Sequence, residues 1–268
     1  MGAWQLANNK INRMQQYEQS FHQILAAILP HIKKKQIRPS LQPAIEKDIT
    51  DAIVMIVGTD RGLCGKFNQS LAENAIDWIE SQQFQSVEIW TLGSRISREL
   101  QRKKITISRQ EAIITGQFAS FQQTYLSTQQ WLKQYEDYHF NKFLILYNGL
   151  KKGGGYRFSV CNLIPYNFQK PTLKTKNIAD IWPSPIIDTD PLGIYKQIVQ
   201  YFIASNYYQT LLKSAAAEHA TRFELMQEAK NNAEEIIEEL GRVINAERKK
   251  KITQEMQELA VGAGLLDY

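Results

Sequence analysis

Cysteine is scarce in this sequence, and its scarcity excludes two common ways of stabilising a fold. Only Cys64 and Cys161 occur among the 268 residues, and neither belongs to a CxxC pair. A disulfide framework or a structural zinc site needs more thiols at closer spacing. The composition therefore indicates a protein that is held together by its apolar core and kept in a reducing compartment.

Long hydrophobic runs are also absent. A helix that crosses a bilayer needs about 20 consecutive apolar residues, and no run in the chain approaches that length. The opening residues, MGAWQLANNKINRMQQYEQ, do not follow the layout of a signal peptide. We therefore expect any association with a membrane to be peripheral.

Charge of one sign is only modestly in excess. The formal net charge of +5 at pH 7 permits attraction to nucleic acid, phospholipid headgroups or an acidic protein, and it does not choose among them. Basic clusters at residues 33–35 and 248–251 motivate one alternative, a basic coiled-coil protein that binds nucleic acid. The aromatic interleaving or recognised motif expected of such proteins is missing.

Proline and glycine are rare at both ends of the chain, which predicts two long helices. Residues 3–29 contain neither, and their apolar side chains recur at helical spacing. No proline follows Pro191, and few glycines interrupt the pattern after that residue. We therefore assign residues 1–36 and 191–268 to an N-terminal and a C-terminal coiled-coil helix, respectively.

The middle of the chain, residues 45–190, is predicted to form a Rossmann-like α/β domain. Short apolar runs expected to be strands alternate with stretches expected to be helices. The predicted strands cover residues 52–57, 87–93, 143–147 and 156–163, and the predicted helices cover residues 69–82, 96–103 and 118–138. The first strand, helix and strand indicate a parallel βαβ unit, and the glycines at 153–155 indicate an antiparallel hairpin.

The C-terminal helix carries an apolar seam too long for one domain to bury. Steps of four and three residues, typical of a coiled coil, join Leu212, Ala216, His219, Phe223, Met226, Lys230, Ala233, Ile237, Leu240 and Ile244. A continuous helix over 192–264 would be about 110 Å long. We therefore expect an antiparallel coiled coil of the two terminal helices, with much of the longer one either meeting another protein or standing in solvent.

The stretch TDRGLCGKFN, residues 59–68, lies after the first predicted strand and invites comparison with a phosphate-binding loop. A Walker loop needs glycine where Asp60 stands and a hydroxyl where Phe67 stands, and the dinucleotide fingerprint GxGxxG also fails at Asp60. Cys64 has no histidine tied to it by a sequence signature. The glycines therefore indicate a tight turn, while an enzyme that binds a phosphate compound through Arg61 and Lys66 remains an alternative.

TDRGLCGKFN resembles the SDRGLCGGFN signature of the gamma subunit of rotary ATP synthases. The C-terminal run from SAAAEHATRFELMQEAK to KKKITQEMQELAVGAGLL is similar to the same family's long helix, with its EHAxRM and ITQEIxEIVxGAxAL patterns. The two regions cover about residues 52–69 and 184–266, in the family's order. The family usually has a further N-terminal helical segment, so either the start codon is assigned too late or the shaft is partly a single helix.

The resemblance implies a fold and a role. In this family an antiparallel coiled coil enters a ring of alpha and beta subunits, while a Rossmann-like domain without nucleotide lies near the membrane ring. The chain would be the non-catalytic central-stalk rotor of an F-type ATP synthase, coupling ion flow to ATP synthesis or hydrolysis. Its partners would be the alpha, beta and epsilon subunits and the c-ring. It would need no cofactor, no metal and no nucleic acid, and it would lie peripherally at the cytoplasmic face of a bacterial plasma membrane.

The resemblance also assigns residues. The family signature turn matches Asp60, Arg61, Gly62, Cys64, Gly65 and Asn68, and the family's contacts with the beta-subunit loops match Arg248, Lys249, Thr253 and Glu255. The family commonly has glutamine where Lys249 stands. Leu259, Val261, Leu265 and Leu266 would form an apolar tip that turns inside the top of the ring. The transported ion is set in the membrane ring and is not encoded here.

Overall fold

The computed structural model of the chain describes residues 3–32, 51–111, 120–138, 142–151, 154–165 and 190–263. It divides into a first unit, Met1–Arg222, and a second unit, Phe223–Tyr268. The helices are α1 (Ala3–Ile28), a 3-10 turn (Leu29–His31), α2 (Phe67–Ser81), α3 (Ser94–Arg102), α4 (Phe121–Tyr138) and α5 (Pro191–Gly262), and the strands are β1 (Asp51–Val57), β2 (Ser86–Leu92), β3 (Arg109–Glu111), β4 (Lys142–Leu150) and β5 (Tyr156–Ile164).

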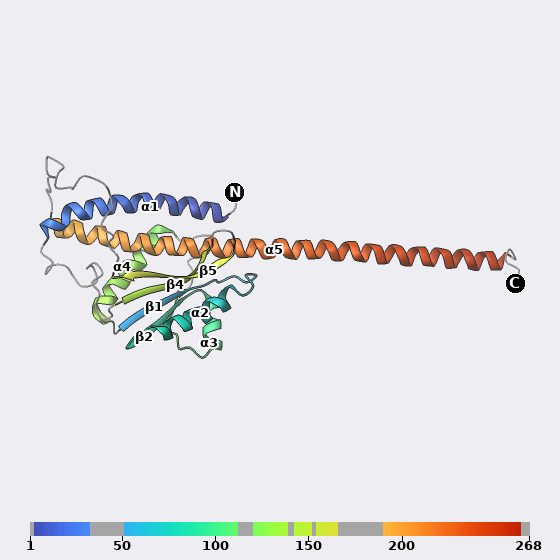
Figure 1. Ribbon diagram of the computed structural model, residues 1–268, viewed down its shortest axis with the longest axis horizontal. Coiled ribbons are helices and arrows are strands. Elements are labelled where there is room, and N and C mark those ends of the chain that lie inside the picture. The colour runs from blue at the N-terminus through green and yellow to red at the C-terminus, as the bar shows by residue number, and fades with distance from the viewer. Residues whose placement is uncertain are drawn as a thin grey trace. The chain divides into compact units, whose positions relative to one another are not determined.

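The first unit is built on a five-stranded sheet in the order β3-β2-β1-β4-β5 (Figure 1). β1 lies between β2 and β4 and is parallel to both, with Val54 opposite Ile89 on one side and Leu144 on the other. β4 and β5 pair antiparallel, as the predicted hairpin requires. A central parallel strand is covered on both faces, which explains why β1 reads DAIVMIV without polar alternation.

The two faces of the sheet are covered by different helices. Val54 and Ile56 of β1 pack with Leu71 of α2 and Ile96 of α3 in one apolar cluster. The alternate residues Ile53, Met55 and Val57 point to the opposite face, because side chains alternate along a strand. The sheet is therefore the middle layer of three, and helical layers shield both of its faces.

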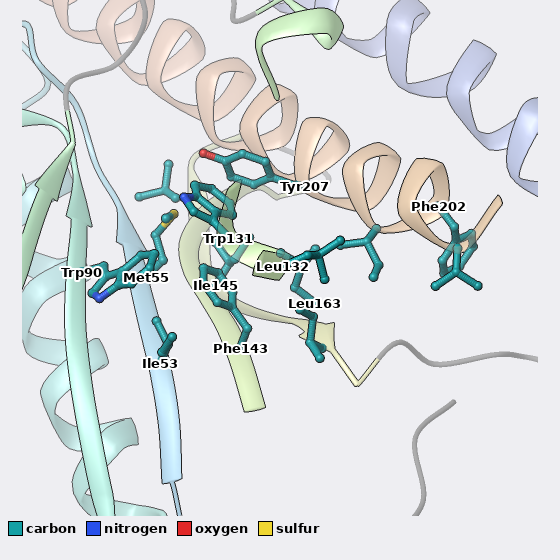
Figure 2. Close-up of a cluster of buried hydrophobic side chains, with 14 of the residues drawn as sticks. Ile53, Met55, Trp90, Trp131, Leu132, Phe143, Ile145, Leu163, Phe202 and Tyr207 are labelled. Carbon is teal, nitrogen blue, oxygen red and sulfur yellow. The ribbon is translucent and has the colours of Figure 1, made fainter. Parts of the chain in front are cut away.

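The second face holds the larger cluster and takes side chains from three helices. Trp131 of α4 stacks on Phe143 at 5.3 Å between ring centroids and meets Tyr207 of α5 edge-on at 4.7 Å. Figure 2 shows these aromatic rings between the sheet and α5, with Phe202 further along the same helix. The beginning of α5 is thus part of the core of the α/β domain.

α1 packs along the beginning of α5 in the opposite direction (Figure 1). Ile11 near the start of α1 contacts Tyr208 and Leu212, whereas His22 near its end lies 5.1 Å from Phe202 between ring centroids. Lower numbers in α1 therefore meet higher numbers in α5. The antiparallel direction agrees with the sequence, while coiled-coil geometry stays a prediction.

The apolar side chains of the predicted seam of α5 are buried in the first unit and exposed in the second. Leu212 and Ala216 are buried, whereas Phe223 is 68% exposed and Ile237 is 67% exposed. None of the described residues of the second unit is buried. The seam beyond Arg222 is thus an apolar row that this chain leaves open to solvent.

Most predicted elements occur within two or three residues of their expected ends, and β3 was not predicted. Its three residues, RQE, carry no apolar alternation, and the strand is defined only by pairing with Trp90, Thr91 and Leu92 of β2. The predicted domain limits at residues 36 and 45 lie outside the described residues. No helix in the described part of the chain is both long and apolar enough to cross a bilayer.

Candidate functional site

The signature turn joins β1 to α2 and is fixed by side chains of its own motif. The Thr59 amide donates to Asn68 Oδ1 at 3.0 Å, and Asn68 Nδ2 donates to Thr59 Oγ1 at 2.9 Å. A Cβ on Gly58 would lie 2.5 Å from the Cβ of Ile96, so this close approach of strand and helix requires glycine. Asn68 therefore ties the end of β1 to the first turn of α2.

Asp60 caps the N-terminus of the helix α3. Its Oδ1 accepts a hydrogen bond from the Ser94 amide at 2.7 Å, at the N-terminus of α3. Free amide groups and the helix dipole make such a terminus an anion site. Here the anion is the protein's own carboxylate, so Asp60 fixes the turn to the start of α3.

Residues 62–65 turn sharply between β1 and α2. Leu63 and Gly65 adopt the left-handed backbone region with φ of 62° and 51°. Arg61 and Leu63 are exposed, while Cys64 is buried. The turn therefore directs the Cys64 side chain inward, and the left-handed conformation at Gly65 is one that glycine adopts at no steric cost.

The crevice at the carboxyl ends of β1 and β4 is filled by the protein itself. The strand order reverses between these two strands, and nucleotide-binding sheets of this order hold their ligand at that reversal. Here Phe67, Cys64 and Ala217 of α5 form a buried cluster, with Leu150 and Tyr156 packed against it. α5 thus contributes to the space that a ligand would take.

Arg222 of α5 closes this cluster with three polar contacts. Its Nε donates to the Gly62 carbonyl oxygen at 3.4 Å, and its Nη2 donates to Cys64 Sγ at 3.2 Å and to Glu218 Oε1 at 2.5 Å. The Arg222 and Glu218 side chains are only 19% and 15% exposed. The ion pair is therefore largely shielded from water and is bound to the turn on one side.

The surroundings of Cys64 do not activate it as a nucleophile. Burial raises the pKa of the thiol, and this effect outweighs the opposing influence of the Arg222 guanidinium. A catalytic cysteine requires a lowered pKa and an adjacent base. The turn thus has a structural role rather than a catalytic one, as the sequence indicated. The sequence did not assign a role to Glu218 and Arg222, although their i,i+4 spacing is a recognisable ion-pair signal.

The predicted beta-subunit contacts lie in the second unit, whereas the turn lies in the first. Arg248, Lys249, Thr253 and Glu255 are all exposed on α5, and the Thr253 hydroxyl donates to the Lys249 carbonyl oxygen at 2.9 Å. Because successive helical residues are about 100° apart, Arg248 and Glu255 share one stripe, and Lys249 and Thr253 share another. The exposed side chains of Ile252, Met256 and Leu259 lie between these stripes.

A crevice filled by the domain's own long helix fits a stalk subunit better than a nucleotide enzyme. The family model described as ATP synthase matches residues 4–266. The chain belongs to this family, in which it is a gamma subunit of the central stalk and has no catalytic role. The family membership does not favour the alternative of a nucleic-acid-binding protein.

Similar proteins agree with this assignment. The chain is 25% identical to the ATP synthase gamma chain of Geobacter sp. (strain M21), over 89% of this chain and 82% of that protein. It is also 25% identical to the ATP synthase gamma chain of Pasteurella multocida (strain Pm70), over 97% of this chain and 91% of that protein. The fold resembles a chain of the Tetrahymena thermophila mitochondrial ATP synthase central stalk and c-ring, with a TM-score of 0.55 and 15% sequence identity. The match covers 85% of this chain and 97% of that one.

Proposed function

We propose that this chain is the rotor through which ion flow in a membrane sector drives ATP synthesis or hydrolysis in a catalytic head. The observation that carries the proposal is the division of α5. Residues up to Thr221 include buried side chains of the α/β domain, and none of the described residues after Arg222 is buried. A helix of 72 residues with one end packed in a domain is suited to carry rotation into a second set of subunits.

The partners we propose are alpha and beta subunits around the second unit, with an epsilon subunit and a c-ring at the α/β domain. The solved relatives include the Euglena gracilis mitochondrial ATP synthase in an OSCP/F1/c-ring assembly, with a TM-score of 0.54 and 14% identity over 99% of this chain and 96% of that one. Apolar residues such as Phe223 and Ile237 are exposed in the single chain. Burial against partner subunits would remove this apolar surface from water.

The coupling mechanism follows from unequal faces of the helix. Arg248 and Glu255 would contact one set of beta-subunit loops, and Lys249 and Thr253 the neighbouring surface. A rotor that contacts each beta subunit differently at each angle changes the relative free energies of that subunit's conformations, and such differential contact is what couples two sites. The terminal helices would complete the shaft as an antiparallel coiled coil.

The protein would act at the cytoplasmic face of a bacterial plasma membrane, where it is held by the complex rather than by a span of its own. No cofactor is proposed, because the cluster of Cys64, Phe67 and Ala217 fills the crevice in which a sheet of this order would hold a nucleotide. The free energy for rotation would come entirely from ion flow or from ATP hydrolysis on other subunits.

Purification of the tagged chain from its native membrane tests this function. We expect alpha, beta and epsilon subunits and the c-ring to copurify with it, and we expect the recovered complex to couple ATP hydrolysis to ion pumping. The double variant Arg248→Ala/Glu255→Ala should lower coupling or assembly while leaving the isolated chain folded, because both residues are exposed.

The matched control is Glu99→Ala/Arg102→Ala, which removes a 2.9 Å ion pair between the half-buried Glu99 and the exposed Arg102 of α3 and is likewise neutral in net charge. Recovery of the chain without any of these subunits would refute the proposed function. Unchanged assembly and ATP synthesis in the Arg248 and Glu255 double variant would refute the assigned contact alone.

A further inference from the structure

The last contacts between α5 and the α/β domain are concentrated at one helical turn. Thr221 is the last buried residue of α5, and Arg222 beside it reaches the signature turn at Gly62 and Cys64. Two sequence motifs that are about 160 residues apart, TDRGLCG and EHATR, therefore meet in space. A contact at the end of the packed part of a helix constrains the adjoining exposed residues more than a contact further inside.

We propose that Gly62, Cys64, Glu218 and Arg222 form a torsional lock, in which Arg222 is the positioning residue that fixes the rotation of α5 about its own axis against the signature turn. This inference rests on the proposed rotor function for its purpose. Its geometry is independent of that function, because all four residues belong to the first unit.

The apolar contacts at this turn cannot fix rotation by themselves. Ala217 is the residue of α5 in the buried cluster with Cys64 and Phe67, and a methyl group presents a small contact without direction. Hydrogen bonds, in contrast, weaken steeply when their angle changes. The planar guanidinium of Arg222 donates from two nitrogens to two residues of the turn, so turning the helix would break both bonds.

Both sides of the lock are held in place. Glu218, one helical turn before Arg222, accepts from the same guanidinium and limits its rotamers. On the other side, Asp60 fixes the turn to α3 and Asn68 fixes it to α2. Torque on α5 would therefore pass through Arg222 into a turn that is bonded to two helices, rather than into a loose loop.

The accessibility of the Cys64 thiol reports directly on the lock in the full chain. In a Cys161→Ala background Cys64 is the only cysteine, and it is 3% exposed. We expect Arg222→Met to raise the rate of Cys64 alkylation by iodoacetamide about tenfold at neutral pH, because local opening loses its hydrogen bonds. The change is diagnostic, since removal of the guanidinium charge alone would raise the thiol pKa and slow the reaction.

Two further variants keep the experiment decisive. Arg222→Lys retains the charge without the fork and should give an intermediate rate. Arg242→Met is the matched control, because Arg242 forms an i,i+4 pair with Glu238 at 3.7 Å on the same helix and both side chains are more than 70% exposed. If Arg222→Met is unfolded by circular dichroism, Glu218→Gln replaces it. Equal alkylation rates in a folded lock variant and in the control would overturn the lock.

The assembled complex tests whether the lock transmits torque. We expect Arg222→Met to lower the number of ions pumped per ATP hydrolysed against a gradient, with alpha and beta subunits still recovered, and Arg222→Lys to restore part of the loss. A wild-type ratio in Arg222→Met complexes whose Cys64 is accessible would refute the torsional role. If the wild-type chain copurified with no such subunits, the rotor function would fail while the alkylation result would stand.

Discussion

The Asp60 carboxylate joins the turn after β1 to the helix α3. Its Oδ1 accepts a hydrogen bond from the Ser94 amide at the N-terminus of that helix. The sequence excluded a phosphate loop at Asp60, because a carboxylate stands where phosphate loops have glycine. It did not indicate the bond to Ser94, which is 34 residues away.

Removal of the Asp60 carboxylate should weaken the fold rather than create a nucleotide site. We expect Asp60→Ala to lower the free energy of unfolding by about 1–2 kcal/mol, the usual loss for a helix cap that also carries a favourable charge. Urea titration would measure the change. Asp77→Ala, on an exposed position of α2, is the control, and an equal loss in both variants would contradict the capping role.

A second residue-scale prediction concerns alkaline pH. Burial raises the pKa of the Tyr207 phenol above its ordinary value, and the nearby Glu111 carboxylate adds to the effect. The unfolded chain releases this proton near pH 10 and the folded chain retains it. The stabilisation is therefore fully present below about pH 10 and is lost at about 1.4 kcal/mol per pH unit above it.

We accordingly expect Tyr207→Phe to flatten the decline of unfolding free energy above pH 10, measured by urea titration at several pH values. The variant keeps the aromatic ring that meets Trp131, so its stability at pH 7 should change little. Parallel curves for the two proteins above pH 10 would contradict a protonated phenol in the folded state.

At the scale of elements, the sequence predicted the helices and strands that a local pattern of apolar residues defines. β1 and β4 are long apolar runs and α2 is a continuous amphipathic stretch, so their existence follows from composition and period. β3 could not be predicted, because its pairing with β2 and not its residues makes it a strand. The contact of Arg222 with Gly62 was equally hidden, since nothing near either residue in sequence indicates the other.

The interior of the helix α5 contains a glycine, Gly241, that weakens the helix without an evident packing reason. Nothing lies within 4 Å of a Cβ placed on Gly241. Gly241→Ala should therefore stabilise the helix locally by about 1 kcal/mol and slow amide hydrogen exchange around residues 237–245 in the full chain. Faster exchange would show that the backbone at Gly241 is not helical in solution, and a change confined to the first unit would point to an indirect effect.

At the scale of the whole molecule, the two units differ in what stabilises them. The first unit has apolar clusters on both faces of its sheet, whereas none of the described residues 223–263 is buried. Isolated helices are only marginally stable in water. We therefore expect the second unit to depend on partners for its stability, as the length of the seam predicts.

Hydrogen exchange by mass spectrometry can test this difference. In the isolated full chain we expect amides of residues 223–263 to exchange orders of magnitude faster than those of β1 and β4, because opening them exposes no core. Assembly with alpha and beta subunits should slow them strongly. Slow exchange in the isolated chain, with a mass of twice the monomer by light scattering, would instead indicate that a second copy covers the apolar row.

The contribution of α5 to the core also has a consequence for synthesis on the ribosome. Tyr195, Val199, Phe202 and Tyr207 complete the cluster that begins with Ile53 and Met55, yet they are made after every strand of the sheet. One face of the sheet therefore stays incompletely covered in the nascent chain until these residues leave the exit tunnel, and exposed apolar surface of this kind invites misassembly. The α/β domain can therefore complete its core only after the beginning of α5 has been synthesised.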